Sequence, residues 1–167
     1  MSIQSDVKPI TISDEVAAST TFIAAAARPN TVFTLANTSF ASGGARLLQV
    51  TTSGTSDNGK TVTVVGTDTH GNSLTEVITS TGSAESVAGT KYFLTVSSAT
   101  CSAQYAANVS VGMTTGAAQA IFAGRVRLKS TSIVSAGSAG VVSFYDGTPE
   151  SGTVLFKART IGTDNAT

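Results

Sequence analysis

Two neighbouring stretches of this sequence alternate residue by residue, and that period of two constrains the fold more than any other feature. In residues 60–67 valine alternates with threonine, and in residues 73–80 the side chains of Leu74, Glu76 and Ile78 fall on one face. Successive side chains of a β-strand point to opposite faces of a sheet. Alternation of this kind therefore predicts two strands with one buried face each.

Turn residues separate these strands from others. Thr69-His70-Gly71-Asn72 joins the two alternating stretches, and Asp57-Asn58-Gly59 precedes the first. Further strands are expected at residues 19–23, 31–35, 46–52, 108–113, 120–128, 132–134, 141–145 and 153–158. Strands that recur every roughly 10–13 residues between Gly, Asn and Asp turns indicate antiparallel pairing. The sequence predicts an all-β fold, an antiparallel β-sandwich or jelly-roll-like arrangement, and contains no βαβ pattern.

The middle of the chain holds less regular elements. Residues 91–97 are apolar on both faces, which predicts one central strand, and Ser86-Val87 predicts a short strand within a loop. Gly66 interrupts an otherwise continuous strand, which predicts a β-bulge.

The N-terminal region gives mixed signals. Residues 7–12 are extended but contain Pro9, which confines them to a sheet edge, a strand start or an arm. Ser13 is a suitable cap for a helix over residues 14–18. The alanine tract Ala24–Ala27 favours a helix by intrinsic propensity.

Composition divides the chain into three parts. We expect an N-terminal arm and first strand in residues 1–30, a main β-sandwich domain in residues 31–116, and a smaller β segment in residues 117–167. The small residues of 112–119 mark the boundary. The last part has too few strands for an independent sandwich. Its sheet would be completed by the N-terminal strand, by another chain or by residues beyond Thr167, and these alternatives stay open.

The charge balance and composition exclude several classes of function. Ten basic residues match ten acidic ones, and 49 of 167 residues are Ser or Thr. A neutral chain without a basic cluster argues against nucleic acid as a ligand. No apolar run approaches the roughly 20 residues that cross a bilayer, and the first residues lack the features of a signal peptide.

Few residues are candidates for chemistry. His70 is the single histidine and lies in a turn, so we interpret it as an exposed turn residue. Asp57, Asn58, Asp68 and Asn72 are oxygen-rich, but their spacing does not match an EF-hand loop, and hydrogen bonds within their own turns explain them.

The other residues that could take part in chemistry or binding also have structural explanations. Cys101 is expected to be a buried small apolar residue. Arg125, Arg127 and Lys129 alternate, which predicts either a solvated strand face or a basic stripe that meets an acidic partner surface. Gly59-Lys60-Thr61 matches only the end of a phosphate-binding loop. We assign no catalytic, cofactor-binding or metal-binding residue.

Several stretches resemble known proteins. Residues 66–79, residues 90–98 (Thr-Lys-Tyr-Phe-Leu-Thr-Val-Ser-Ser) and residues 108–112 (Asn-Val-Ser-Val-Gly) resemble a β-sandwich module of tailed-bacteriophage structural proteins. Residues 127–130, 140–148 and 151–155 resemble another such virion segment. The likeness covers residues 46–156 and includes no catalytic motif.

The resemblance implies a non-enzymatic virion protein, since modules of this type occur in capsid decoration (cement) proteins and in tail components. We expect a decoration protein that stabilises the capsid from its exterior by binding between subunits of the major capsid protein. Its partners would be that protein and copies of itself in a homotrimer, with no nucleic acid, membrane or cofactor. It would be made in the host cytoplasm without a signal peptide.

Two other functions remain as alternatives. A tail or fibre component would bind a host surface glycan through exposed aromatic side chains, for which Tyr105 and Tyr145 are the best candidates. An enzyme such as a depolymerase is disfavoured because carboxylates are scarce and no pair is evident.

Overall fold

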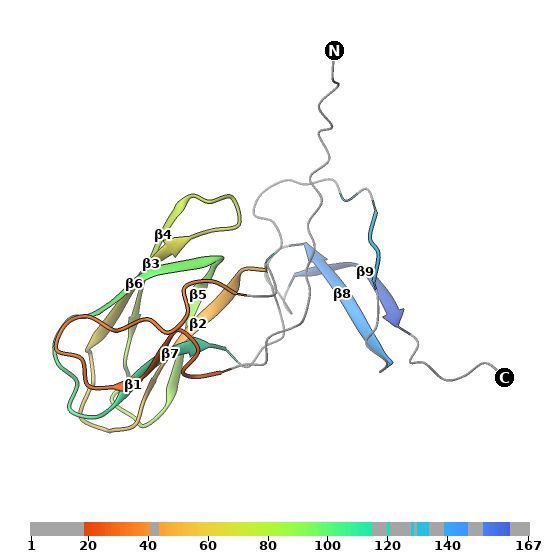
Figure 1. Ribbon diagram of the computed structural model, residues 1–167. Coiled ribbons are helices and arrows are strands. Elements are labelled where there is room, and N and C mark those ends of the chain that lie inside the picture. The colour runs from red at the N-terminus through yellow and green to blue at the C-terminus, as the bar shows by residue number, and fades with distance from the viewer. Residues whose placement is uncertain are drawn as a thin grey trace, which may run out of the picture. The chain divides into compact units, whose positions relative to one another are not determined.

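The computed structural model describes residues 19–40, 44–114, 120, 128, 130–133, 139–146 and 152–160, and these contain β-strands but no helix (Figure 1). The strands are β1 (Ala24–Ala27), β2 (Arg46–Thr52), β3 (Thr61–Thr67), β4 (Ser73–Thr79), β5 (Ser86–Phe93), β6 (Thr95–Cys101), β7 (Val109–Met113), β8 (Gly140–Asp146) and β9 (Thr153–Thr160). The predicted all-β, antiparallel architecture with a smaller C-terminal sheet is confirmed.

The chain forms two compact units, Met1–Ala123 and Gly124–Thr167. The first holds a four-stranded sheet, in the order β1-β7-β2-β5, and a three-stranded sheet, in the order β4-β3-β6. The second holds the hairpin β8-β9. All the pairings between named strands are antiparallel.

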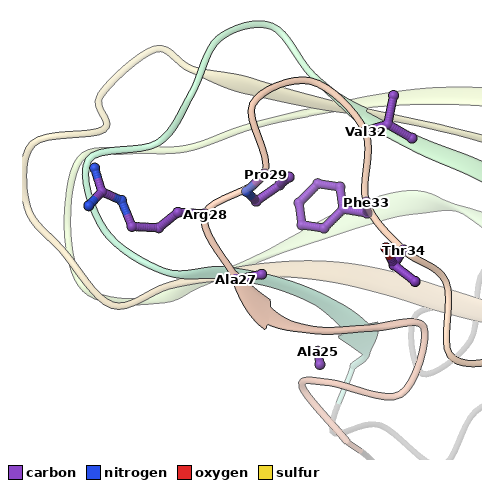
Figure 2. Close-up of a pocket in the computed structure, with 7 residues that line it drawn as sticks. All are labelled: Ala25, Ala27, Arg28, Pro29, Val32, Phe33 and Thr34. Carbon is purple, nitrogen blue, oxygen red and sulfur yellow. The ribbon is translucent and has the colours of Figure 1, made fainter.

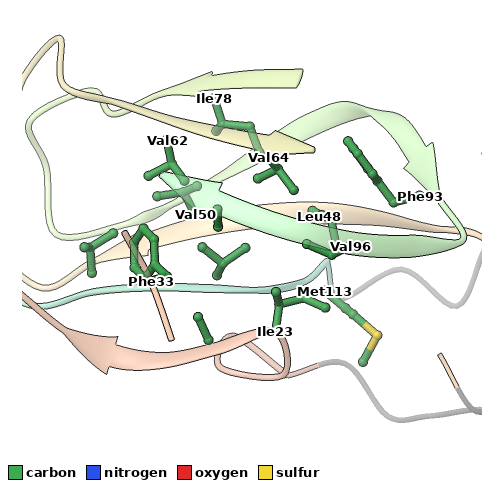
Figure 3. Packing of buried hydrophobic residues seen from close by; sticks show 14 of the residues in the cluster. Ile23, Phe33, Leu48, Val50, Val62, Val64, Ile78, Phe93, Val96 and Met113 are labelled. Atoms are coloured by element: carbon green, nitrogen blue, oxygen red, sulfur yellow. The ribbon is translucent and has the colours of Figure 1, made fainter. Parts of the chain in front are cut away.

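The two sheets of the first unit enclose one hydrophobic core. Figure 3 shows Val62, Val64 and Ile78 of the three-stranded sheet beside Leu48 and Val50 of β2. The alternation in β3 and β4 has its predicted outcome, because Val62, Val64 and Ile78 point into the core and the threonines of both strands point outward. Val77 belongs to the outward set and is 56% exposed. Removal of this apolar surface from water is the main force that holds the sheets together.

The predicted central strand over residues 91–97 is wrong. The chain breaks at Leu94, where β5 ends in the four-stranded sheet and β6 begins in the three-stranded one. Both segments are rich in strand-forming residues, and nothing local marks the change of sheet. The short strand expected at Ser86-Val87 is the start of the eight-residue β5.

The N-terminal part of the first unit also differs from expectation. The alanine tract is not a helix but the edge strand β1, because pairing with β7 outweighs its helix propensity. Residues 20–23 are turns and bends rather than a strand, and residues 31–35 contain only an isolated bridge, between Val32 and Thr100.

Residues 31–39 nevertheless have a clear role, because they run along β6. Phe33 N–H donates to the carbonyl of Ala99 (3.0 Å), and Thr31 and Thr38 accept from Cys101 N–H (2.7 Å) and Val96 N–H (2.8 Å). This segment covers the β6 edge of the three-stranded sheet. A covered edge does not offer its backbone to other chains.

Gly66 lies at the bulge that the sequence predicted, where the pairing of β3 with β6 shifts register between Val65 and Gly66. A Cβ atom at this position would collide with the backbone of Thr95. The glycine is therefore required by the close approach of two strands.

Several expectations fall outside the described residues. These are the extended stretch 7–12, the helix over residues 14–18 and nearly all of the strand expected over residues 120–128. Ala120 is described and forms an isolated bridge with Ala45. The strands expected at 141–145 and 153–158 are confirmed as β8 and β9.

Candidate interaction site

The turn between β3 and β4 holds His70, which is exposed as predicted. Asp68 Oδ1 accepts hydrogen bonds from the backbone N–H groups of His70 (2.8 Å) and Asn72 (2.9 Å), and Oδ2 accepts from the Asn72 side-chain amide (3.1 Å). Partial burial raises the pKa of Asp68, but these hydrogen bonds outweigh it and hold the pKa below its ordinary value. The interpretation of Asp68 and Asn72 as turn residues is confirmed.

Asp57 does not behave as a simple turn residue, and that prediction is corrected. Its side chain is 0% exposed. Its carboxylate accepts hydrogen bonds from the backbone N–H groups of Ala106 (2.7 Å) and Ala107 (3.3 Å), in the loop before β7. It also forms an ion pair with Lys60 Nζ at 2.9 Å. Burial raises the pKa of Asp57. The hydrogen bonds from these donors, with Ala106 the strongest, outweigh burial and leave the pKa below its ordinary value.

Lys60 and Tyr105 extend this cluster. Lys60 Nζ donates to the carbonyl of Gln104 (2.6 Å) and lies 5.5 Å from the centroid of the Tyr105 ring. The Tyr105 hydroxyl lies 3.0 Å from Ser80 Oγ, and the Tyr105 carbonyl accepts from Arg28 Nε (3.1 Å). We call Arg28, Asp57, Lys60, Ser80 and Tyr105 the Asp57 network. It joins four loops at one end of the first unit.

The Asp57 network overturns one expectation about recognition. Tyr105 was a candidate for stacking on a sugar, but it is 0% exposed and its ring lies in the core. Burial raises the pKa of its hydroxyl, which the hydrogen bond with Ser80 partly offsets. Tyr105 cannot contact a glycan in this structure. Tyr145, the other candidate, is 36% exposed.

Glu76 connects the two sheets along the β4 and β5 edges. Its side chain is buried, and Oε1 accepts hydrogen bonds from the backbone N–H (2.5 Å) and the hydroxyl (2.9 Å) of Thr90. Lys91 Nζ reinforces the connection by donating to the carbonyl of Thr75 (2.7 Å). A Cβ atom on Gly89 would collide with the Glu76 carboxylate. The position of Glu76 beside Leu74 and Ile78 in the alternating strand is the sequence signal that could have identified it.

Cys101 is buried, as predicted, and burial raises its pKa to about 11. Among the described residues no group of three or more His, Cys, Asp or Glu side chains could hold a metal ion. Within the same ranges no helix is long and apolar enough to cross a bilayer. The stripe of Arg125, Arg127 and Lys129 lies outside the described residues.

The hairpin β8-β9 carries a set of exposed apolar side chains. In the order of the chain these are Val141 (61% exposed), Val142 (38%), Tyr145 (36%), Val154 (41%) and Leu155 (60%). The register pairs Tyr145 with Val154, and Phe144 with Phe156. The two phenylalanine rings stack with centroids 4.3 Å apart. We call the five exposed side chains the hairpin patch, which extends over both faces of the hairpin because Val141 and Val142 are consecutive in β8.

A second surface feature lies beside the edge strand β1. Figure 2 shows a pocket between β1 and the returning segment around Phe33, lined by Ala25, Ala27, Arg28, Pro29, Val32, Phe33 and Thr34. Its volume is about 280 Å³. We call this pocket the β1 groove. Sequence patterns alone do not predict this groove, because it depends on β1 being a strand.

Comparisons of this chain with protein-family models, with curated proteins and with solved structures find no match.

Proposed function

We propose that this chain is a non-enzymatic structural protein of a tailed-bacteriophage virion. In this proposal it is a capsid decoration protein that sits on the capsid exterior as a homotrimer and binds between subunits of the major capsid protein. The proposal starts from the resemblance of residues 46–156 to virion modules. The structural observation that carries it is the hairpin patch.

Two features of the hairpin support a role in binding. A two-stranded hairpin is marginally stable alone in water and usually packs against a further strand or sheet. Val141 and Tyr145 share one face of β8, and Val154 is the register partner of Tyr145. Exposed apolar side chains that share a face favour a protein contact. Val141 and Leu155 are more than half exposed and project from different strands of the hairpin. A partner that covers both strands would remove this surface from water.

The charges of the hairpin indicate the chemistry of that partner. The register places Arg159 opposite Val141 and Lys157 opposite Ser143, so both exposed basic side chains share a face with Val141. An apolar centre with basic groups beside it suits a partner surface that is apolar with an acidic rim. The major capsid protein would supply that surface.

The first unit would act as a rigid body on the capsid. Its two sheets share one core, the Asp57 network joins its loops at one end, and Glu76 connects the sheets along one side. The outward residues of β3 and β4 are mostly hydroxyl-bearing and uncharged. Repeated by the symmetry of the capsid, many weak contacts of such a body add up to strong binding.

To test the proposal, the full chain is incubated with capsids that lack decoration. The mixture is then sedimented, and the heat resistance of the capsids is measured. We expect the chain to sediment with the capsids and to raise their disruption temperature. Val141→Lys should weaken binding at least tenfold. Val77→Lys is the matched control, because Val77 is similarly exposed (56% against 61%) but lies on β4 in the first unit. Absence of a complex, or equal loss with both variants, would overturn the proposal.

One observation favours the tail or fibre alternative. Tyr145 is partly exposed beside Val154, and an aromatic ring beside an apolar side chain is suited to stacking on a sugar. A glycan array probed with the full chain and with Tyr145→Ala tests this alternative. Binding that the substitution abolishes would support it, and an array without a hit would exclude the sugars displayed.

A further inference from the structure

Asn58 and Gly59 form the one Asn-Gly pair among the six asparagines of the sequence. They are the middle residues of a turn between β2 and β3, in which Lys60 N–H donates to the carbonyl of Asp57 (3.3 Å). Gly59 has a φ of +76°, a backbone conformation that glycine adopts without strain. Both residues of the pair are exposed. An accessible side-chain amide is thus followed by a backbone nitrogen that no Cβ atom shields.

An Asn-Gly pair can undergo an intramolecular reaction that needs no enzyme. The backbone nitrogen of Gly59 forms a bond to Cγ of Asn58, the bond from Cγ to Nδ2 breaks, and ammonia leaves with the proton of the Gly59 N–H. Water then opens the resulting succinimide ring at one of its two carbonyls. One opening gives aspartate. The other gives isoaspartate, in which the backbone runs through Cβ and Cγ of the former asparagine.

The fold restrains the attacking nitrogen. Gly59 N–H donates a hydrogen bond to the carbonyl of Ser80 (2.9 Å), and Ser80 N–H donates to the carbonyl of Lys60 (2.8 Å). These two bonds continue the β3–β4 ladder past the start of β3 and the end of β4. Bonds at the end of a ladder open at a lower free energy than bonds in its centre. Attack on Asn58 therefore requires local opening at Gly59, and not unfolding of the first unit.

The other asparagines lack this combination. Each is followed in the sequence by Thr, Ser, Val or Ala, which all carry a Cβ atom beside the attacking nitrogen. The side-chain amide of Asn37 donates to a backbone carbonyl (2.7 Å), and that of Asn72 donates to Asp68 Oδ2 (3.1 Å). Within the part of the chain that the structure describes, the Asn58 amide has no such bond. Asn58 is therefore the asparagine most open to this reaction.

We propose that Asn58 is a site of spontaneous deamidation and isomerisation, and that the hydrogen bond from Gly59 N–H to the Ser80 carbonyl controls its rate. The proposal concerns the chemistry of the chain itself and does not depend on binding to a capsid.

The products act on the Asp57 network, because Asp57 directly precedes the modified residue and Lys60 follows it by two positions. Aspartate at position 58 places a second negative charge beside the buried carboxylate of Asp57, and like charges disfavour each other. Isoaspartate also lengthens the backbone of the turn by one carbon atom. The turn has no room on one side, because even a Cβ atom on Gly82 would collide with Asn58. Isoaspartate should therefore weaken the first unit more than aspartate does.

Peptide mass spectrometry of the full chain, stored at mildly alkaline pH and sampled over weeks, measures the conversion at each asparagine. We expect Asn58 to give a mixture of aspartate and isoaspartate at least tenfold faster than Asn37 or Asn72 reacts. In guanidinium chloride, which removes the bond between Gly59 and Ser80, Asn58 should react at least tenfold faster than in the folded chain. An Asn58 that stays intact in the folded chain, or equal rates in the two states, would overturn the proposal.

Two glycine variants test the control by the turn. Gly82 and Gly71 both have positive φ, at +80° and +82°, so alanine is similarly strained at either position. A Cβ atom at position 82 would collide with Asn58, whereas nothing lies within 4 Å of one at position 71. Gly82→Ala should speed the conversion of Asn58 at least threefold, and Gly71→Ala should leave it unchanged. Equal rates in the two folded variants would contradict the proposal, and if Gly82→Ala does not fold, the comparison in guanidinium chloride decides.

Urea denaturation of fresh and stored samples tests the effect on the Asp57 network. The stored wild type should contain a less stable population that grows with the conversion of Asn58. Asn58→Gln keeps an amide but needs a larger ring for the same attack, so its stability should not change with storage. Freshly made Asn58→Asp carries the charge without the longer backbone and should be more stable than the isoaspartate form. Equal stability of fresh and fully converted wild type would exclude an effect on the network.

Discussion

The carboxylate of Asp57 accepts a hydrogen bond of 2.7 Å from the backbone N–H of Ala106, a residue 49 positions further along the chain. The bond fixes the loop after β2 to the loop before β7. Lys60 joins the same carboxylate from three residues away. A side chain in a turn thus helps to hold one end of the first unit together.

Asp57→Ala should therefore destabilise the first unit. The substitution leaves the N–H groups of Ala106 and Ala107 and the Lys60 ammonium without this acceptor, and the expected decrease in the free energy of unfolding is about 2 kcal/mol. Urea denaturation measures it. Asp68→Ala is the control, because its carboxylate bonds only within its own turn and the loss should be smaller. Equal losses would contradict this account of Asp57.

Acid should weaken the fold through the same carboxyl group. The folded-state pKa of Asp57 lies below its ordinary value, so the unfolded chain takes up the proton at a higher pH than the folded chain does. The free energy of unfolding then decreases as pH falls from the ordinary aspartate range towards the folded-state pKa, and the contribution is complete above that range. Urea denaturation at a series of pH values should show a shallower dependence for Asp57→Asn than for the wild type. An unchanged dependence would exclude Asp57 as a source.

Glu76 is expected to protect the backbone of the β4–β5 side from solvent exchange. Glu76→Ala removes the acceptor of Thr90 N–H, so the amide hydrogens of Thr90 and Lys91 should exchange at least tenfold faster. Hydrogen exchange followed by NMR gives the rate at each residue. Glu85→Ala is the control, because Glu85 is exposed. Exchange that remains slow at Thr90 would rule out this role of Glu76.

Cys101 should react slowly with thiol reagents. With a pKa of about 11, its thiolate fraction at pH 8 is about one in a thousand, and the thiolate is the reactive species. We expect reaction with a disulfide reagent to be at least a hundredfold slower in the folded chain than in the chain unfolded in urea. Similar rates in the two states would show that Cys101 is accessible.

The parts of the fold that depend on local pattern could be predicted from the sequence. The alternation in β3 and β4 and the turn at His70 are properties of adjacent residues. Because side chains alternate with a period of two, only one arrangement places the apolar set of residues on the buried face. Gly66 belongs to the same class, since a glycine inside a strand pattern indicates a bulge.

The parts that depend on distant partners could not be predicted. Ala24–Ala27 is a strand because β7 lies beside it, which the tract itself does not indicate. The break at Leu94 follows no turn signal. Asp57 reads as a turn residue until Ala106 is placed next to it. The β1 groove exists only because Ala24–Ala27 is a strand, so a sequence pattern that favours a helix for this tract cannot predict it.

The break at Leu94 also has a mechanical consequence. A single residue separates β5 in one sheet from β6 in the other. A force applied to one sheet is therefore transmitted to the other through the covalent backbone, because the connection between them is too short to extend. The two sheets cannot slide past each other without breaking the pairs at both ends of this link. The first unit should therefore yield under load as one piece, with a single rupture event rather than a gradual extension.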